Sequence, residues 1–380
     1  MKHQLLQLFP LLCSSFLVAL FAVGIIVPKI RSFALRIGAY QQGGSSHGAG
    51  TRIHQGKLPN IGGIAIYIGF FLALLVGAAF LPSALGLFEG ASSAALTEAR
   101  IQLLAIILGT TLMCLVGFLD DLWEVPAAVR LLTQLIATLI LIVNGIKIEF
   151  ITNYFSSAEY LFFNEGLSII VTVLWVIGFT NAFNFIDGLD GLSSGISTIS
   201  SMALLAVAIQ SHSPLVAILV LSALAGASLG FLRHNFNPAT IIMGDSGAYA
   251  LGFALAAASV LGALKVTATV TVAAPILILA LPVLNITQVT LRRLKRGSHL
   301  AEASNDHLHD LIRQRSGSHR VTVLILWLAA LALAILGMII SHTPTSLMVV
   351  TVLASVAFIS LVSFLRLQEA AQEVEVNVKV

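Results

Sequence analysis

The chain has 380 residues, of which 58% are hydrophobic and only 10% carry a charge. Ordinary soluble domains carry about 25% charged residues, so this composition excludes a soluble globular enzyme, a disordered chain and a nucleic-acid-binding domain. The formal net charge is +3, and in a membrane protein such an excess of Lys and Arg usually marks cytoplasmic loops. The composition therefore predicts an all-α, polytopic integral membrane protein.

Hydrophobic segments recur along the chain at lengths that fit transmembrane helices, which need roughly 20 apolar residues each. The first segment follows Lys2 and has no small-x-small cleavage site after it, which favours a retained span over a signal peptide. Cys13 and Cys114 lie inside hydrophobic segments, so we expect packing residues rather than a disulfide or a metal pair. In chain order, eleven spans are predicted at 8–28, 61–81, 101–119, 127–146, 167–183, 192–211, 214–232, 247–264, 268–291, 321–340 and 346–366.

Lys and Arg are distributed unevenly between the segments that join these spans. Segments 29–60 and 292–320 hold twelve of the twenty, and the positive-inside rule places both in the cytoplasm. An odd number of spans then leaves the N-terminus outside and the C-terminus inside. All seven aspartates fall on this cytoplasmic side. We expect one catalytic membrane domain over 1–366, with cytoplasmic loops 29–60, 120–126, 184–191, 233–246 and 292–320 and a solvated cytoplasmic tail over 367–380.

Two adjacent carboxylates, Asp120 and Asp121, end the third predicted span in the sequence Gly-Phe-Leu-Asp-Asp. Such a pair repels itself at neutral pH unless a cation or hydrogen-bond donors lie near. The pair indicates either a solvated helix end or a site for Mg²⁺ and phosphate chemistry.

Polar side chains recur every three residues between the fifth and sixth spans, at Asn181, Asn184, Asp187 and Asp190. In a helix or a tight turn they would share one face. Gly188 beside them allows close approach of another group. Two carboxylates and two amides between apolar spans are costly unless a ligand uses them, which favours a binding site over a plain hydrophilic turn.

Three further segments lie on the same side of the membrane. Asp245 opens a span in Met-Gly-Asp-Ser-Gly, where it is either an N-cap or another oxygen ligand. His307-x-His309 suggests zinc, but in a loop rich in arginine it fits the binding of an anionic ligand better. Near Lys57, the pair Gly62-Gly63 indicates either tight helix packing or a phosphate contact made with Arg52 and Lys57.

These residues together put oxygen ligands and cationic donors at one membrane face. Carboxylate and amide oxygens favour Mg²⁺ or Mn²⁺ over zinc or copper, and Mg²⁺ usually shares its ligands with substrate phosphates. The expected substrates are a nucleoside diphosphate compound from the cytoplasm and a lipid held beside an apolar wall.

The motifs around Asp120, Asn184 and Asp245 resemble those of the polyprenyl-phosphate N-acetylhexosamine-1-phosphate transferases, glycosyltransferase family 4. The resemblance rests on Gly-Phe-Leu-Asp120-Asp121, Asn181-x-x-Asn184-x-x-Asp187-Gly-x-Asp190-Gly-Leu, Gly244-Asp245-Ser-Gly, Arg52-x-His54 with Pro59 and Gly62-Gly63, and His307-x-His309. It runs from about residue 50 to residue 320. Two of its loops are more similar to the undecaprenyl-phosphate N-acetylglucosamine-1-phosphate transferases than to the phospho-N-acetylmuramoyl-pentapeptide transferases. Asp310 stands where the third histidine of the family motif is usual.

The resemblance implies a reaction in which polyprenyl (undecaprenyl) phosphate attacks the β-phosphate of a UDP-N-acetylhexosamine, with UDP-GlcNAc as the expected donor. UMP leaves, and the lipid-linked pyrophosphoryl sugar serves a cell-envelope polymer such as lipopolysaccharide or teichoic acid. The partners implied are the UDP-sugar, the polyprenyl phosphate and the membrane, with a homodimer left open and no nucleic acid. The location implied is a bacterial inner (plasma) membrane, with the active site facing the cytoplasm.

The resemblance also implies residue roles. Asn184 and Asp245 would hold Mg²⁺, or Mn²⁺ in its place, and Asp120 would orient or deprotonate the lipid phosphate with support from Asp121. The catalytic set implied is Asp120, Asp121, Asp187, His307 and His309, and the substrate-binding set is Lys57, Asn181, Gly188, Leu189, Asp190, Asn235 and Arg313.

A phosphate monoester has a second pKa of about 6, so the lipid nucleophile is mostly dianionic at pH 7 and needs no strong base. This favours direct displacement, with Asp120 as a positioning group, over a covalent aspartyl-phosphate intermediate, which stays open. The rival functions are a phospho-N-acetylmuramoyl-pentapeptide transferase and an ion-coupled transporter. Transporter sites usually lie near the membrane midplane, whereas the aspartates of this chain lie at one rim.

Overall fold

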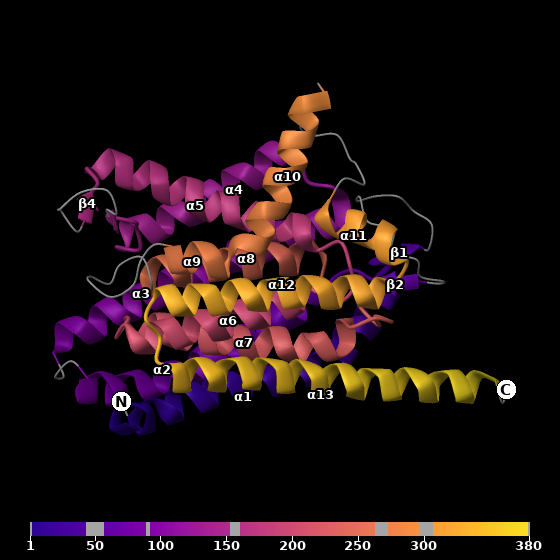
Figure 1. Ribbon diagram of the computed structural model, residues 1–380, viewed down its shortest axis with the longest axis horizontal. Coiled ribbons are helices and arrows are strands. Elements are labelled where there is room, and N and C mark those ends of the chain that lie inside the picture. Colours follow the sequence, from indigo (N-terminus) through magenta and orange to yellow (C-terminus); the bar gives the residue numbers. More distant parts are fainter. Residues whose placement is uncertain are drawn as a thin grey trace.

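The computed structural model describes the backbone of residues 2–42, 57–88, 92–152, 160–262, 273–296 and 307–378. Long helices run side by side as a bundle, and the two ends of the chain lie at opposite ends of it (Figure 1). The helices are α1 (Lys2–Ile37), α2 (Gly62–Phe88), α3 (Ser93–Trp123), α4 (Ala127–Val143), α5 (Glu165–Ile186), α6 (Leu192–Gln210), α7 (Leu215–Asn235), α8 (Gly244–Gly262), α9 (Ala273–Ile278), α10 (Ala280–Arg296), α11 (Leu308–Ser316), α12 (His319–Ile340) and α13 (Thr345–Val378). Two antiparallel hairpins pair β1 (Tyr40–Gln42) with β2 (Lys57–Pro59) and β3 (Phe150–Thr152) with β4 (Tyr160–Phe162).

The predicted all-α, polytopic membrane fold is confirmed. Among the described residues, nine helices are long and apolar enough to cross a membrane: α1, α2, α3, α5, α6, α7, α8, α12 and α13. The shorter apolar helix α4 corresponds to the fourth predicted span.

The ninth predicted span, 268–291, is wrong as a single helix. Its described part forms two helices, α9 and α10, which meet at Leu279, and α10 turns away from the direction of the bundle (Figure 1). Pro282 explains the break, because proline has no N–H to donate to the carbonyl of Ile278 four residues before it. That carbonyl instead accepts a hydrogen bond from Ser200 Oγ of α6, at 3.2 Å.

Several helices extend further than their hydrophobic segments. Ser92 begins α3 eight residues earlier than predicted, because its hydroxyl accepts a hydrogen bond from Ala95 N at 3.1 Å. α3 then continues past its apolar part and ends at Glu124, which has a left-handed φ of 51° shortly before Pro126. The predicted tail 367–380 continues the last helix, since α13 is helical through Val378, and its exposure to the cytoplasm stays a prediction.

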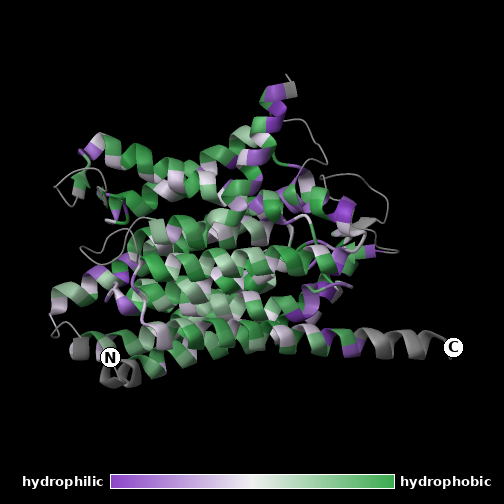
Figure 2. Ribbon diagram, in the orientation of Figure 1, coloured by the Kyte–Doolittle hydropathy of each residue, from purple (hydrophilic) through white to green (hydrophobic). Residues whose placement is uncertain are grey.

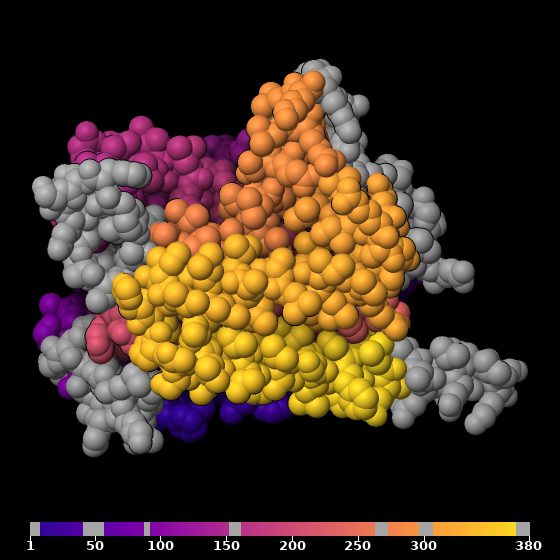
Figure 3. Space-filling model, viewed as in Figure 1, coloured from indigo at the N-terminus to yellow at the C-terminus, as the bar shows by residue number. Residues whose placement is uncertain are grey.

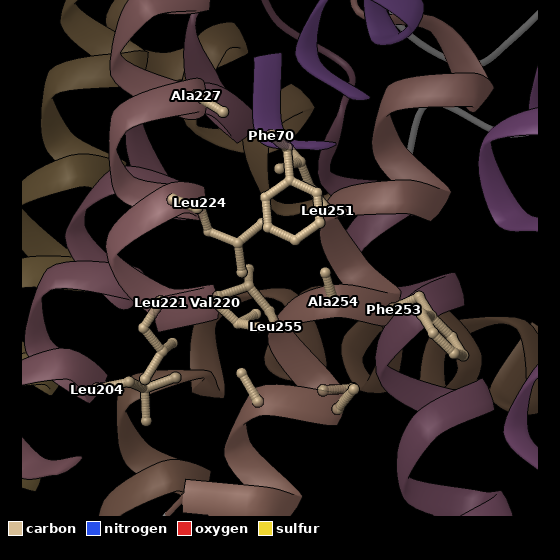
Figure 4. Packing of buried hydrophobic residues seen from close by; sticks show 14 of the residues in the cluster. Phe70, Leu204, Val220, Leu221, Leu224, Ala227, Leu251, Phe253, Ala254 and Leu255 are labelled. Carbon is tan, nitrogen blue, oxygen red and sulfur yellow. The ribbon is translucent and has the colours of Figure 1, made fainter. Parts of the chain in front are cut away.

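The core of the bundle is formed by α6, α7 and α8. All of the most apolar part of α7 is buried, and α1, α2, α3, α5, α12 and α13 pack around these three helices. Figure 4 shows Phe70 of α2 packed with Leu224 of α7 and Leu251 of α8. Because lipid tails are as apolar as leucine, close packing rather than hydrophobic burial holds such helices together. Gly226 and Gly230 of α7 accordingly lie directly against the backbone of α1, where any side chain would overlap it.

Polar residues gather at one end of the bundle, where β1, β2 and α11 lie, whereas the middle is hydrophobic (Figure 2). At this end the loops predicted at 120–126, 184–191 and 233–246 are shortened by the helices that enter them. Asp120, Asp121 and Asn184 are helical residues in the last turns of α3 and α5, and Asp245 is in the first turn of α8. Rigid helix ends therefore position these side chains.

Candidate active site

Glycines bring three helices close together at the polar end. Gly117 of α3 lies against the backbone of Asp245 and Ser246, and Gly63 of α2 lies against Gly247, so that a Cβ on either glycine would overlap backbone atoms. The Gly63 N–H also donates to the carbonyl of Met243 at 2.7 Å. These contacts support tight packing as the role of the Gly62-Gly63 pair, and they hold the start of α8 between α2 and α3.

Asp245 lies at the centre of this arrangement. Its Oδ1 accepts a hydrogen bond from Asn184 Nδ2 of α5 at 2.7 Å. The carboxyl group of Asp120 from α3 lies within hydrogen-bonding reach of Asp245. Three residues separated by more than 60 positions in the sequence are thus brought together, as the motifs predicted.

Asp120 is held by a residue that the sequence did not single out. Its Oδ2 accepts from Arg130 Nη1 at 2.6 Å, and its Oδ1 accepts from the backbone N–H of Val125 at 2.6 Å. Arg130 Nη1 also lies 3.3 Å from Tyr249 Oη of α8. In the sequence, Arg130 resembles an ordinary cation at the start of an apolar helix, and its position ten residues after Asp120 was the only signal.

Asp121 caps α8 across the helix interface. Its Oδ1 accepts from Asp245 N at 2.8 Å and its Oδ2 accepts from Ser246 N at 3.1 Å. The first N–H groups of a helix have no partner within it, and a charged acceptor there also interacts favourably with the helix dipole. Asp245 is therefore not the cap of its own helix, because Asp121 fills that position. A supporting role of Asp121 toward a metal ion stays a prediction.

The site gathers more carboxyl groups than cationic groups. Three carboxylates, from Asp120, Asp121 and Asp245, lie together with one guanidinium, that of Arg130. Carboxylates in such proximity are stabilised by a further cation. Within the described parts of the chain, no three His, Cys, Asp or Glu side chains are arranged to hold an ion by themselves. The donor set fits Mg²⁺, which uses one or two carboxylates and takes its other ligands from water and substrate phosphates.

A second polar cluster lies beside the first, in the turn between α5 and α6. Asp190 is buried, and its Oδ2 accepts from Asn237 Nδ2 at 3.1 Å and from Ala239 N at 3.4 Å. Asn235 Oδ1 accepts from Gly191 N at 2.9 Å. Leu189 is fully buried in the same turn. These contacts tie the turn to the connection between α7 and α8, and contact of Leu189, Asp190 and Asn235 with a nucleotide stays a prediction.

The histidine pair closes the site from α11. The rings of His307 and His309 are stacked with centroids 5.3 Å apart and an interplanar angle of 6°, and Phe185 of α5 stacks on His307 at 5.8 Å. Asn285 Oδ1 of α10 accepts from the backbone N–H of Leu308 at 2.8 Å, which fixes the start of α11. Both histidines are buried. Asp310, the residue in place of the third histidine, has its Oδ2 3.7 Å from His309 Nε2.

Gly188 links the turn after α5 to this pair, because a Cβ at position 188 would overlap the ring of His309. We expect Gly188→Ala to displace that ring and, given the predicted role of His309, to lower turnover by up to about 100-fold, the cost that a shift of about 1 Å in a reacting group can have. Gly178→Ala is the matched control, since Gly178 lies on α5 with nothing within 4 Å of its Cβ position. Equal rates of UMP release for the two purified variants would contradict the proposed contact.

The predicted residues do not all share one face, because α5 ends at Ile186, within the repeating motif. Asn181 pairs with Gln134 of α4, with hydrogen bonds of 2.7 and 3.3 Å between the two amides. Asp187 is the C-cap residue of α5, and its N–H donates to Asn184 O at 3.1 Å.

The remaining candidates lie on β2, on α11 or outside the described residues. Lys57 is exposed on β2, with its Nζ 4.7 Å from the ring centroid of Tyr40. Arg313 lies in the last turn of α11. Arg52 and His54 lie outside the described residues.

The fold and the site define a polytopic membrane protein with a carboxylate-rich centre at one end of its helix bundle. Residues 103–263, which run from within α3 to the end of α8, match the family model described as Glycosyl transferase family 4. A probable undecaprenyl-phosphate N-acetylglucosaminyl 1-phosphate transferase of Bacillus subtilis is 30% identical over 92% of this chain and 90% of its own length. The chain belongs to glycosyl transferase family 4.

Other relatives extend the comparison. A decaprenyl-phosphate N-acetylglucosaminephosphotransferase of Mycobacterium tuberculosis is 30% identical over 82% of this chain and 77% of that protein. A phospho-N-acetylmuramoyl-pentapeptide-transferase of Listeria monocytogenes is 34% identical, but over only 66% of this chain and 75% of its own length. Another phospho-N-acetylmuramoyl-pentapeptide-transferase, of Desulforudis audaxviator, is 30% identical over 85% of this chain, so coverage alone does not separate the two groups of relatives.

Proposed function

We propose that the protein transfers N-acetylglucosamine 1-phosphate from a UDP-sugar to a polyprenyl phosphate, with undecaprenyl phosphate as the expected lipid. The observation that carries this proposal is the meeting of Asp120, Asn184 and Asp245 at the polar end of an apolar bundle. A site at that rim suits a reaction between a water-soluble donor and a membrane-bound acceptor. The names of the Bacillus subtilis and Mycobacterium tuberculosis relatives support the sugar and the class of lipid.

In the proposed reaction, an oxygen of the lipid phosphate forms a bond to the β-phosphorus of the UDP-sugar. The bond from that phosphorus to the oxygen bridging the two phosphates breaks, and UMP leaves with this oxygen and its electron pair. Phosphoryl transfer depends mainly on positioning and charge neutralisation. The lipid phosphate is already mostly dianionic at pH 7, so no residue has to act as a strong base.

Different residues of the carboxylate cluster would position the substrates and neutralise their charge. The Asn184 carbonyl oxygen and the Asp245 carboxylate would hold Mg²⁺, which supplies neutralisation of the pyrophosphate charge when bound. The Arg130 guanidinium would hold the lipid phosphate, since its planar group suits phosphate oxygens, and Asp120 orients Arg130 through their 2.6 Å contact. His307 and His309 would donate hydrogen bonds to the sugar or phosphates, and the turn at Gly188–Asp190 would receive the uridine.

We also propose that the site faces the cytoplasm of a bacterial cell from its inner membrane. The concentration of Lys and Arg in segments 29–60 and 292–320 supports this orientation. The described parts of these segments include β1, β2 and α11, which lie at the polar end of the bundle. The polymer served and homodimer formation stay predictions.

The direct test uses purified protein, undecaprenyl phosphate and a panel of UDP-GlcNAc, UDP-GalNAc and UDP-N-acetylmuramoyl-pentapeptide, with UMP release and lipid product measured together. We expect release with UDP-GlcNAc that depends on the lipid. Release with the muramoyl-pentapeptide donor alone would favour the function of the Listeria relative. Uptake of labelled donor into proteoliposomes without any lipid product would favour the transporter.

A further inference from the structure

α13 is the most lipid-exposed of the candidate spans, with only 22% of its apolar window buried inside the protein. It lies along the outer face of the bundle next to α12 (Figure 3). Near the polar end of this helix, however, Arg366 is only 3% exposed. Burying a charged side chain is costly unless it is fully engaged by hydrogen-bond partners. The hydrogen bonds of Arg366 must therefore offset the cost of burying its charge.

The Arg366 guanidinium holds a single backbone carbonyl with two of its nitrogens. Nε and Nη2 donate to Pro238 O at 3.1 and 2.9 Å. Pro238 belongs to the connection between α7 and α8. In the same connection, Arg320 Nε of α12 donates to Asn237 O at 3.2 Å. Two consecutive carbonyls of this connection are thus held by arginines from the last two helices.

The residues on either side of Pro238 in turn hold Asp190. Asn237 Nδ2 and Ala239 N both donate to Asp190 Oδ2. Since Pro238 lies between these two donors, a displacement of its carbonyl changes the direction of both. Arg366 is therefore connected to Asp190 through one backbone segment, although it lies on a different helix and 176 positions later in the sequence.

We propose that Arg366 is a positioning residue for the nucleotide-binding turn: it fixes the 237–239 segment, which in turn fixes the Asp190 carboxylate. This inference rests on the proposed function, which gives the turn at Gly188–Asp190 the uridine. In this proposal α13, whose apolar surface otherwise faces lipid, supports the nucleotide-binding turn through Arg366. Arg366 itself does not touch the substrate in this proposal, so its loss acts on the donor nucleotide and spares the lipid acceptor.

The first test measures kinetics and UMP binding for Arg366→Ala and Arg366→Lys in the full-length protein. Arg366→Ala is expected to weaken UMP binding and raise KM for the UDP-sugar about tenfold, as expected for loss of hydrogen bonds from a charged group. KM for undecaprenyl phosphate is expected to change less than about twofold, within the scatter of surface substitutions. Lysine keeps the charge but not the paired donors, so Arg366→Lys is expected to lie between Ala and the wild type.

The control is Glu369→Gln, which removes the ion pairs of Glu369 with Arg233 at 2.6 Å and with Arg366 at 3.9 Å and leaves the carbonyl contact in place. We expect this variant to bind UMP like the wild type. Equal weakening by Glu369→Gln and Arg366→Ala would overturn the proposal, because the ion pair rather than the carbonyl contact would then be responsible. Parallel changes in the KM values for both substrates would do the same.

A double-mutant cycle with Asp190→Asn separates positioning from general destabilisation. If Arg366 acts through Asp190, Arg366→Ala weakens UMP binding far less in the Asp190→Asn background than in the wild type. Additive effects would overturn the proposal. If Arg366→Ala does not fold, Arg366→Lys carries the same cycle.

Hydrogen exchange gives a readout that does not depend on activity. The amides of residues 236, 237 and 239–243 are expected to exchange faster in Arg366→Ala than in the wild type, and unchanged exchange would refute the contact. The two proposals can also fail separately. If the wild type releases no UMP from any UDP-sugar, the proposed function is refuted, but faster exchange in Arg366→Ala would still support the positioning of Asp190 by Arg366.

Discussion

Replacing Asp245 with asparagine is expected to lower the rate of UMP release at least about 100-fold, the loss typical of removing one preorganised electrostatic group. Asparagine preserves the shape of the side chain but removes its charge, and the Asn184 amide at 2.7 Å would then face a neutral partner. The measurement is kcat with UDP-GlcNAc and undecaprenyl phosphate in detergent. Asp120→Asn is expected to behave similarly, because it removes the carboxylate that holds Arg130.

The matched control is Glu124→Gln, a carboxylate three positions after Asp121. Glu124 is exposed at the end of α3 and contributes only its backbone N–H, which donates to Asp120 O. Its side-chain charge can therefore be removed without changing the cluster, and we expect a rate within about twofold of the wild type. An Asp245→Asn rate similar to that of Glu124→Gln would remove Asp245 from the active site.

Removal of divalent ions with EDTA is expected to abolish turnover, and Mg²⁺ is expected to restore it. Without the ion, the pyrophosphate would lie beside three carboxyl groups with only the Arg130 guanidinium to neutralise its charge. Mn²⁺ should substitute because it accepts the same oxygen ligands, whereas Zn²⁺ should restore little. The measurement is UMP release after passage through a chelating resin and addition of each metal, and full activity in EDTA would contradict the metal site.

Hydrophobicity was sufficient to predict most of the fold. Ten of the eleven predicted spans have a corresponding apolar helix, because a run of about 20 apolar residues leaves the chain few alternatives in a membrane. The exception is 268–291, where hydrophobicity does not predict the break between α9 and α10. Composition alone does not reveal that Pro282 leaves the Ile278 carbonyl free, or that Ser200 of another helix satisfies it.

Motif spacing predicted which residues meet, but not how each is used. Asp120, Asn184 and Asp245 come together as expected, because polar side chains at the same membrane face avoid the lipid by packing against one another. The partners of these residues depend on which helices are neighbours, and a single sequence does not contain that information directly. Arg130 was missed for this reason, and Asn181, to which the family resemblance gives a substrate-binding role, forms a hydrogen-bonded amide pair with Gln134.

The cap that Asp121 provides for α8 makes loss-of-function data at the aspartate pair ambiguous. Substitution of Asp121 removes two hydrogen-bond acceptors from the first turn of α8, to which Asp245 belongs, and we expect the displaced turn to lower activity even if Asp121 never approaches a substrate. A mutational screen would thus score the two adjacent aspartates alike, even if Asp120 alone takes part in the proposed reaction and Asp121 acts only by capping α8. Purified yield and melting temperature, recorded beside each rate, would tell the two contributions apart.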